Sequence, residues 1–341
     1  MSTPLLQVEQ LEKRFPIQRG FFRRTVADLC AVKQVSFAVS TGETLCLVGE
    51  SGCGKSTVAK LILRLIEPSH GRIILEGHDV TNLNAAAMRP FRRRMQIVFQ
   101  DPYSSLNPRL TAEQIVTEPL ENFNRLTAVE RRDRAASLLA RVGLGVDALG
   151  RFPFEFSGGQ RQRLGIARAL SVHPTFIVAD EPVSALDVSV QAQVLNLLLD
   201  LQEEFGLAYL FISHDLAVVE HVGHRIAVMY LGRIVELAER ARLFANPGHP
   251  YSEALIAAAP VPDPRRARPS TILEGEVPSP INPPPGCAFH PRCPYAIPRC
   301  REEEPALVTW PDGRLVACHV REPTSWLEEA QHEAVHCDTD Q

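Results

Sequence analysis

The chain reads LVGESGCGKST from Leu47 to Thr57. This stretch has the spacing Gly-x-x-x-x-Gly-Lys-Ser, with an apolar run before it and a helical pattern, KSTVAKLILRLI, after it. A strand, a glycine-rich loop and a helix in this order predict a phosphate-binding P-loop. The glycines let backbone N–H groups turn toward phosphate oxygens, and the helix N-terminus adds the positive end of its dipole. The alternative is a glycine-rich turn that carries a lysine by chance, and the order of the three elements disfavours it.

Chemistry assigns roles to three side chains of this loop and to an acidic pair downstream. Lys55 reaches the β- and γ-phosphates, the Ser56 hydroxyl ligates Mg²⁺, and Thr57 is placed to bind on the α-phosphate side. The run TFIVADEP ends in Asp180 and Glu181. A carboxylate at the end of a buried strand beside a P-loop is where a Mg²⁺ partner belongs, and the adjacent glutamate polarises a water. An isolated Asp-Glu pair often caps a helix, so this interpretation depends on the P-loop.

A second anion site is predicted in FSGGQRQRLGIARAL, at 156–170. Ser157 is a good N-cap, and the glycines Gly158 and Gly159 leave backbone N–H groups exposed at the start of a helix. Because one ATP has one γ-phosphate, a second site for that phosphate is most useful where it faces another copy or a partner.

Taken together, six motifs of this chain resemble the ATP-binding cassette (ABC) ATPases. They follow the order of that family: the Walker A loop, a glutamine in IVFQDP, the SGGQR signature, the Walker B run, SALD and a histidine in FISHD. Alone, the glutamine would be a surface amide and the histidine an ordinary strand-end residue. The resemblance covers residues 5 to about 245. In this sequence the motifs fall at 49–57, Gln100, 157–161, 176–181, 184–187 and His214.

The resemblance implies an α/β fold of the P-loop NTPase class. An ABC cassette combines a RecA-like core with a β-subdomain and an inserted helical subdomain, which we expect at about 103–171. Short apolar runs alternate with helical patterns up to residue 245, as this class requires. Proline-rich text then marks a boundary. We therefore expect two domains, a nucleotide-binding domain at 1–245 and a small C-terminal extension at 246–341.

The same resemblance implies the catalytic and metal-binding residues. Glu181 acts as the general base or positions the water, and His214 contacts the γ-phosphate and senses hydrolysis. Gln100 contacts Mg²⁺ or the water and links the core to the helical subdomain. Asp180 holds Mg²⁺ through water, and Ser56 ligates it. Both catalytic positions are present, so we expect a site that hydrolyses ATP.

An aromatic side chain early in the chain stacks on adenine in this family. Phe15 stands at the matching place, and Phe21 or Phe22 compete with it because the segment 16–31 is longer than in compact cassettes. The signature closes over the ATP of an opposing subunit, so two cassettes bind head to tail with ATP between them. The full set of expected ATP-binding residues is Phe15, Gly49, Ser51, Gly52, Cys53, Gly54, Lys55, Ser56, Thr57, Ser157, Gly158, Gly159 and Gln160.

Length and composition limit the classes of protein to which this chain can belong. The chain has 341 residues, 45% of them hydrophobic and 22% charged, with a formal net charge of −4. This balance argues mildly against a dedicated nucleic-acid binder. No apolar run approaches the ~20 residues that cross a membrane, and the N-terminus lacks a secretory signal pattern, which predicts a cytoplasmic protein. The basic cluster Arg89, Arg92, Arg93 and Arg94 could mark a contact with a membrane or with nucleic acid, but a solvated loop before a strand is the commoner case and is the interpretation here.

One cassette without a membrane span implies, in this family, transport through a separate permease. The sequence shows neither the tandem cassettes of translation factors nor the coiled coils or zinc hooks of repair ATPases. QDPYSSLNPRLT at 100–111 and NPGHPYSEALIAAAPVPDP at 246–264 resemble the importer ATPases for oligopeptides and dipeptides. The same ATPase type serves nickel and glutathione importers, so the solute stays open, and a soluble ABC ATPase outside transport is the remaining alternative.

The resemblance also implies ligands, partners and a location. The ligands are ATP and Mg²⁺. The partners are two membrane permease subunits, a second ABC ATPase subunit in a homodimer or paired heterodimer and, indirectly, an extracytoplasmic solute-binding protein, with no nucleic acid. The chain is then expected to lie peripherally on the cytoplasmic face of the inner membrane.

Four cysteines gather in the last part of the chain, three of them in PGCAFHPRCPYAIPRC at 285–300. Their spacing lacks the two tight CxxC knuckles of a zinc ribbon and is wider than in bacterial ferredoxins. The importer family carries such a set with a proposed [4Fe–4S] cluster, so the resemblance implies that cluster. The alternatives are zinc, with His290 or His319 as substitute ligands, reduced structural thiols and disulfides. The four residues are Cys287, Cys293, Cys300 and Cys318.

Overall fold

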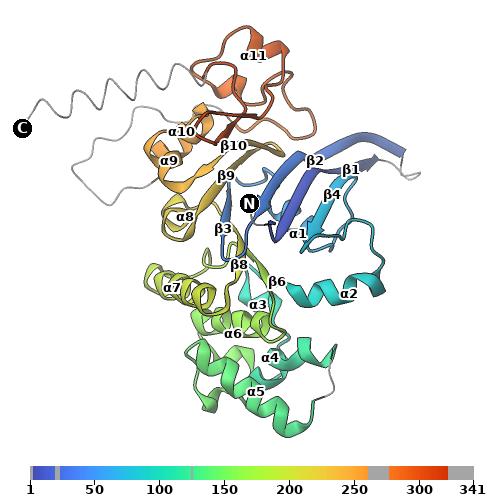
Figure 1. Cartoon of the computed structure of the whole chain (residues 1–341), viewed down its shortest axis with the longest axis vertical. Helices are drawn as coiled ribbons and strands as arrows, with labels where there is room; N and C mark the ends of the chain where they lie inside the picture. The colour runs from blue at the N-terminus through green and yellow to red at the C-terminus, as the bar shows by residue number, and fades with distance from the viewer. Residues whose placement is uncertain (1–2, 20–23, 124–125, 260–275, 322–341) are drawn as a thin grey trace, which may run out of the picture.

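The structure is a computed structural model that describes residues 3–19, 24–123, 126–259 and 276–321 (Figure 1). Phe21, Phe22, the linker 260–275 and the tail from residue 322 lie outside these ranges. Within them, no helix combines the length and the apolarity that crossing a bilayer requires.

An eight-stranded sheet forms the core, in the order β11-β12-β10-β9-β3-β8-β7-β6. The strands from β6 to β9 pair in parallel, and β10 returns antiparallel to β9. Their near-continuous apolar runs, such as FIVAD and AYLFIS, suit strands that are covered on both faces. The bounds are β3 Thr44–Val48, β6 Met95–Val98, β7 Phe176–Asp180, β8 Ala208–Ser213, β9 Arg225–Tyr230, β10 Arg233–Glu239, β11 Val308–Thr309 and β12 Leu315–Val316.

Side chains of strand β3 alternate between two hydrophobic cores, one on each face of this sheet. Leu45 and Leu47 pack in the core that also holds the β-subdomain and helix α1, Lys55–Ile62. Cys46 and Val48 pack in the core that holds the helices of the opposite face. This two-residue period is the one that a strand imposes on its side chains. The P-loop that follows β3 therefore leaves from a strand anchored on both faces.

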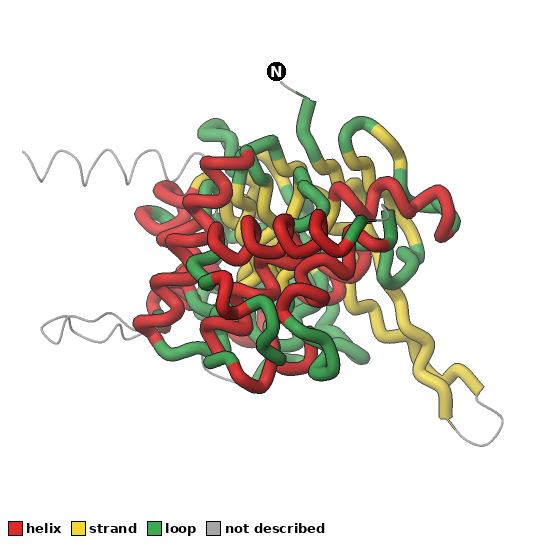
Figure 2. The backbone as a smooth tube through the Cα atoms, turned by 90° about the horizontal axis from the view of Figure 1, so that it is seen from below, coloured by secondary structure: helices red, strands yellow, loops and turns green. Residues whose placement is uncertain are grey.

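A second, antiparallel sheet forms the β-subdomain, in the order β2-β1-β4-β5. Its long strands β1 and β2 pair along their whole length and run out from the body as a hairpin (Figure 2). The bounds are β1 Leu6–Arg19, β2 Arg24–Val39, β4 His70–Leu75 and β5 His78–Asp79.

The helical subdomain lies at the end of the molecule opposite the C-terminal extension (Figure 1). Three of its helices begin with a capping box, in which a Ser or Thr side chain and the side chain three residues on each bond the other's backbone N–H. The capped pairs are Thr111 with Gln114, Thr127 with Glu130 and Ser157 with Gln160. The elements are α3 Pro102–Ser105, α4 Ala112–Glu121, α5 Ala128–Arg141, η1 Val146–Ala148, η2 Pro153–Glu155 and α6 Gly158–Leu170.

The basic cluster before β6 is helical, so its interpretation as a solvated loop is wrong. Helix α2, Ala85–Arg94, begins at Asn84, whose side chain accepts from the Ala87 N–H, and Met88 anchors the helix in the core. Three alanines favour the helix, and basic residues in its last turn complement the negative end of the dipole. The remaining helices are α7 Val188–Phe205, α8 Leu216–Val222, α9 Arg240–Ala245, α10 Pro250–Ala258, η3 His290–Arg292 and α11 Arg299–Glu302.

The C-terminal extension is joined to the cassette through the central sheet. Strand β12 pairs antiparallel with β10, matching Glu236 with Val316 and Leu237 with Leu315, and β11 pairs with β12. A domain boundary near residue 245 stays a prediction, because the sheet continues across it.

The sequence His-Pro-Tyr leads into helix α10, and its histidine, the N-cap residue that precedes the helix, is buried and neutral. His249 is 1% exposed, and its Nδ1 accepts the Tyr251 N–H at 3.0 Å, which caps the helix. The Gly248 and His249 N–H groups both donate to the buried Glu236 carboxylate. Burial, with the positive charge of Arg321 as a smaller cause, lowers the pKa of His249 from 6.5 to about 3.

This buried histidine predicts a loss of stability in mild acid. The imidazole binds a proton in the unfolded chain below pH 6.5 and in the folded chain only near pH 3. Its contribution is therefore complete above pH 6.5 and is lost as the pH falls toward 3, by about 2 kcal/mol between pH 7 and pH 5. His249→Asn keeps a capping acceptor and does not titrate. In urea unfolding, this variant should lose about 2 kcal/mol less than the native chain over that range. Equal losses would contradict the assignment.

Candidate active site

The P-loop turns sharply between β3 and α1, and two of its glycines have no space for a side chain. A Cβ on Gly49 would lie 2.2 Å from the Met229 carbonyl oxygen. A Cβ on Gly54, whose φ is 108°, would lie 2.3 Å from the Ala31 carbonyl oxygen. The loop therefore packs directly against β2 and β9, and glycine is required at both positions.

Lys55, the first residue of α1, lies inside this loop. Its side chain is buried, and its Nζ donates to the carbonyl oxygens of Gly49 at 2.7 Å and Glu50 at 3.0 Å. The ammonium group is thus held where the loop curls around it. A fixed positive charge at the N-terminus of a helix is suited to bind phosphate.

Ser56 and Asp180 form the pair expected to bind Mg²⁺. The Ser56 hydroxyl donates to Asp180 Oδ1 at 3.1 Å. Burial raises the pKa of the Asp180 carboxyl, and the hydrogen bond from Ser56 acts in the opposite direction. A hydroxyl and a carboxylate side by side at the end of a buried strand are oxygen donors of the kind that Mg²⁺ prefers, so these residues fit the ion.

Glu181 contacts both of the other residues that the sequence predicts to be catalytic. Gln100 Nε2 donates to Glu181 Oε2 at 2.8 Å, and His214 Nδ1 lies 3.3 Å from the same oxygen. The backbone of Glu181 has a φ of 48°, a value that residues other than glycine rarely adopt. Its N–H donates to the Ile212 carbonyl of β8, which holds it in that conformation. Backbone strain of this kind concentrates at functional sites.

One cavity of about 610 Å³ contains these groups. It is lined by the P-loop, by Gln100, Glu181 and His214, and by Phe15 from β1. The Phe15 ring is half-buried and lies 5.1 Å from Lys13 Nζ. Because Phe15 lines the cavity, its position agrees with a role in stacking on adenine. The competing aromatic residues Phe21 and Phe22 lie outside the described residues.

The signature residues lie outside this cavity, at the start of α6 in the helical subdomain. The Ser157 hydroxyl accepts from the Gln160 N–H, and the Gln160 side chain accepts from the Ser157 N–H. A Cβ on Gly159 would lie 2.3 Å from Val190 Cγ1, so the signature packs against α7. The chain thus brings the P-loop, Gln100, Asp180, Glu181 and His214 together and leaves the signature apart from them.

Four contacts of the cavity and its loop were not expected from the sequence. Gly232, in the turn between β9 and β10, donates its N–H to Cys53 O at 2.9 Å. Glu50 is bonded by Tyr251 and Arg292 of the extension, and Pro280 of the extension lines the cavity. No spacing in the sequence signals these contacts, because their residues lie up to 242 positions apart.

The four cysteines of the extension lie near one another but do not enclose a metal. Burial, with the other thiols of the set as a smaller cause, raises the pKa values of Cys287 and Cys293 to about 11. Within the described residues, no group of three or more His, Cys, Asp or Glu side chains is placed to hold an ion. His290 and His319 each turn a ring nitrogen to a backbone carbonyl. The cysteines that the structure describes all carry free thiols.

Comparisons with known proteins agree with this geometry. The family described as ABC transporter matches residues 32–184, and the family described as oligopeptide/dipeptide transporter, C-terminal region, matches 235–300. A probable peptide ABC transporter ATP-binding protein of Sinorhizobium fredii is 65% identical, over 95% of this chain and 92% of its own length. An oligopeptide transport ATP-binding protein of Bacillus subtilis is 52% identical over 93% and 97%, and a dipeptide transport ATP-binding protein of Haemophilus influenzae is 49% identical over 93% and 97%.

Solved structures give the same fold. A dimeric ATP-binding cassette bound to ADP and Pi is 30% identical, with a TM-score of 0.62 over 69% of this chain and 98% of that one. The cbiO1 protein of Clostridium perfringens, part of an ABC transporter complex, is 26% identical, with a TM-score of 0.62 over 72% and 92%. The expected fold class is confirmed. With the P-loop, the cluster around Glu181 and both family matches in place, the chain belongs to the ABC transporter ATPases, in the group with the oligopeptide/dipeptide transporter C-terminal region.

Proposed function

We propose that this ATPase powers the import of oligopeptides or dipeptides through a separate membrane permease. The observation that carries the catalytic half is the Glu181 carboxylate, held by Gln100 and His214 beside the Ser56–Asp180 pair. The transport half is supported by the match of the extension to a peptide-transporter region and by relatives that are named for peptide transport. The first alternative is an importer for nickel or glutathione. A soluble ABC ATPase that does not act in transport is the less favoured alternative.

Hydrolysis then follows from the placement of each side chain. Lys55 and the loop N–H groups bind the β- and γ-phosphates, and Phe15 stacks on adenine. Ser56 and Asp180 would hold Mg²⁺ with Gln100 close by, and the bound ion offsets the negative charge of the phosphates. Glu181 accepts a proton from the attacking water, and His214 contacts the γ-phosphate.

A second cassette completes the site in this proposal. Ser157 and the segment around Val188 are exposed, and Val188 is 81% exposed although it is apolar. An opposing cassette would cover this face and present its own Ser157, Gly158, Gly159 and Gln160 to the ATP. Both a homodimer and a paired heterodimer satisfy this arrangement.

The helical subdomain is the proposed contact with the permease. Tyr103 and Phe154 are 66% and 69% exposed, which leaves apolar surface near the Gln100 loop. Two permease subunits would dock there, placing the chain peripherally on the cytoplasmic face of the inner membrane. A solute-binding protein would then act on the permease from outside. The proposed division is a nucleotide-binding domain at 1–245 and an extension at 246–341.

The cofactor of the extension is a separate proposal, a [4Fe–4S] cluster with Zn²⁺ as the alternative. Only the chemistry of the cysteine set supports it, because the side chains as they lie do not enclose a metal. Protein purified without oxygen is expected to be brown, with visible absorption that a reductant bleaches and with iron in metal analysis. A colourless, iron-free protein would contradict the cluster, and zinc in that sample would establish the alternative.

The transport proposal is tested by capture from the cells that make the protein. An affinity-tagged chain, drawn from detergent-solubilised membranes, should bring down two membrane-spanning subunits that mass spectrometry identifies as permeases. Recovery without any membrane-spanning protein, or with ribosomal or DNA-repair proteins instead, would contradict the proposal.

A further inference from the structure

The second residue of the P-loop motif, Glu50, is bonded to the C-terminal extension. Arg292 donates to both carboxylate oxygens of Glu50, from Nη1 to Oε2 at 2.7 Å and from Nη2 to Oε1 at 3.0 Å. The Glu50 N–H donates to the Tyr251 hydroxyl at 2.9 Å. A two-point guanidinium–carboxylate pair fixes direction as well as distance.

The same residue is also bonded to the phosphate-binding lysine. The Glu50 carbonyl accepts from Lys55 Nζ at 3.0 Å, and the Gly49 carbonyl accepts from it at 2.7 Å. The carboxylate, N–H and carbonyl of Glu50 therefore contact Arg292, Tyr251 and Lys55 respectively. One residue joins the extension to the group that binds phosphate.

The two residues of the extension that contact Glu50, Tyr251 and Arg292, are both held firmly by their surroundings. Tyr251 is fully buried, and its ring packs against the rings of Tyr230 at 4.6 Å and Phe289 at 5.4 Å between centroids. The Arg292 side chain is 5% exposed, against 25% for Glu50. Because this ion pair is largely desolvated, removing one partner leaves the other poorly compensated.

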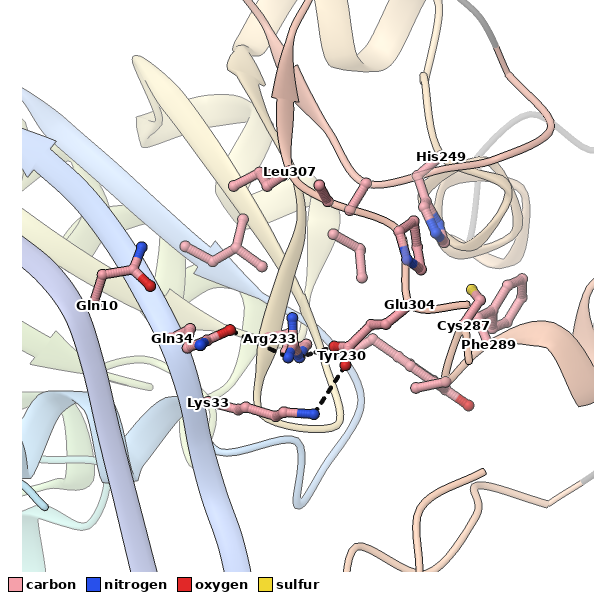
Figure 3. A pocket seen from close by; sticks show the side chains of 16 residues that line it. Gln10, Lys33, Gln34, Tyr230, Arg233, His249, Cys287, Phe289, Glu304 and Leu307 are labelled. Carbon is pink, nitrogen blue, oxygen red and sulfur yellow. Dashed lines mark hydrogen bonds and ion pairs between the residues drawn. The ribbon is translucent and has the colours of Figure 1, made fainter. Parts of the chain in front are cut away.

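The extension is held in register with the P-loop by a second group of contacts. Glu304 bonds Lys33 of β2 at 3.0 Å and forms an ion pair with Arg233 of β10 (Figure 3). The cavity of about 250 Å³ beside them is lined by the cassette on one side and by the extension on the other. The neighbouring Gly232 donates to the P-loop carbonyl of Cys53.

We infer that Arg292 and Tyr251 are positioning residues for ATP: through Glu50 they hold the P-loop in its phosphate-binding conformation, so the C-terminal extension sets the affinity of the cassette for nucleotide. This inference rests on the proposed placement of the ATP phosphates in the P-loop. Neither side chain lines the nucleotide cavity, so both act through Glu50 and not on ATP directly.

The test measures MgATP binding to the full-length chain by calorimetry, in the Glu181→Gln background to prevent hydrolysis. Arg292→Met keeps the apolar stem, and Glu50→Gln keeps the size of the side chain. Each should weaken MgATP binding about tenfold, the size of one lost charge-assisted hydrogen bond. The double variant should be no weaker than the weaker single one, because both changes remove the same pair. Arg292→Lys, which keeps one bond, should recover part of the loss.

Two further variants separate positioning from general damage. Tyr251→Phe removes only the hydroxyl and should weaken binding severalfold, since it leaves the Glu50 N–H without its acceptor. Arg299→Met is the matched control, because Arg299 pairs with Glu303 at 2.7 Å inside the extension and does not contact the P-loop. It should bind MgATP like the native chain. With Glu181 restored, Arg292→Lys should raise KM for ATP and leave kcat within about twofold, as loss of uniform binding predicts.

Three outcomes would overturn the inference: native affinity in Arg292→Met and Tyr251→Phe, additive losses in the double variant, or an equal loss in Arg299→Met. If Arg292→Met fails to fold, MgATP binding by Arg292→Lys and Tyr251→Phe tests the inference in its place. Lys55→Ala separates this inference from the placement of ATP. Undiminished ATP binding by Lys55→Ala would refute that placement. Loss of binding there, with native affinity in the Arg292 and Tyr251 variants, would refute the inference alone.

Discussion

Glu181→Gln is expected to lower kcat for ATP hydrolysis by about two to four orders of magnitude, the range of a lost general base. Glutamine keeps the size of the side chain and an oxygen that accepts from Gln100 Nε2 at this position. What it loses is the ability to take a proton from water. Steady-state phosphate release measures the effect, and Glu203→Gln, an exposed carboxylate on α7, is the control that should hydrolyse at the native rate.

The same variant should bind MgATP and accumulate as an ATP-bound dimer, because the bond between cassettes persists while the γ-phosphate stays in place. Sedimentation with and without MgATP measures this assembly. Adding Ser157→Arg should abolish the dimer and leave nucleotide binding to the P-loop intact, since Ser157 lies outside the cavity of its own chain. Native turnover in Glu181→Gln would refute the catalytic assignment. A dimer that survives Ser157→Arg would refute the signature interface.

Lys55→Ala is expected to weaken MgATP binding at least about a hundredfold, because it removes charge-assisted bonds to two phosphates. The ammonium group is buried in the loop and already held by two carbonyl oxygens, so its position costs little to organise when ATP binds. Titration with a fluorescent ATP analogue measures the loss. Lys60→Ala, an exposed lysine on the same helix, should retain affinity within about threefold, the scale of a surface charge change.

A contrary result for Lys55 would have a clear meaning. Binding within a few-fold of native would show that the phosphates lie elsewhere. The thermal unfolding midpoint of the variant without nucleotide is the accompanying measurement, and it separates lost affinity from lost structure.

Much of the arrangement of the candidate active site can be predicted from the sequence, because its geometry is local or is imposed by the sheet. Gly49 to Gly54 form one loop and Lys55 and Ser56 begin the helix after it, so their spacing alone defines the motif. Asp180 ends strand β7, Glu181 follows it and His214 follows the neighbouring strand β8, and parallel strands end at the same edge. A motif at the end of each strand therefore predicts that these side chains meet.

The parts that were missed depend on long-range packing or on weak local signals. The pair Glu50–Arg292 joins residues 242 positions apart, and its existence depends on how the extension folds back onto the cassette. The sequence favours a loop where helix α2 lies, because Pro90 interrupts the pattern and one buried methionine gives no apolar period to reveal the helix. The sequence supplied the four cysteines, but their spacing does not determine how the thiols lie.

ATP-driven peptide uptake is the most direct test of the central claim, that this ATPase powers peptide import. The complex captured with its permease would be reconstituted in lipid vesicles with ATP on the side of the cassette, and uptake of a labelled tripeptide delivered by its binding protein would be measured. The account predicts accumulation that requires ATP and disappears in the Glu181→Gln complex. Peptide accumulation that is equal with and without ATP, or equal in the native and Glu181→Gln complexes, would contradict it, as would ATP-driven uptake of nickel with no uptake of peptide.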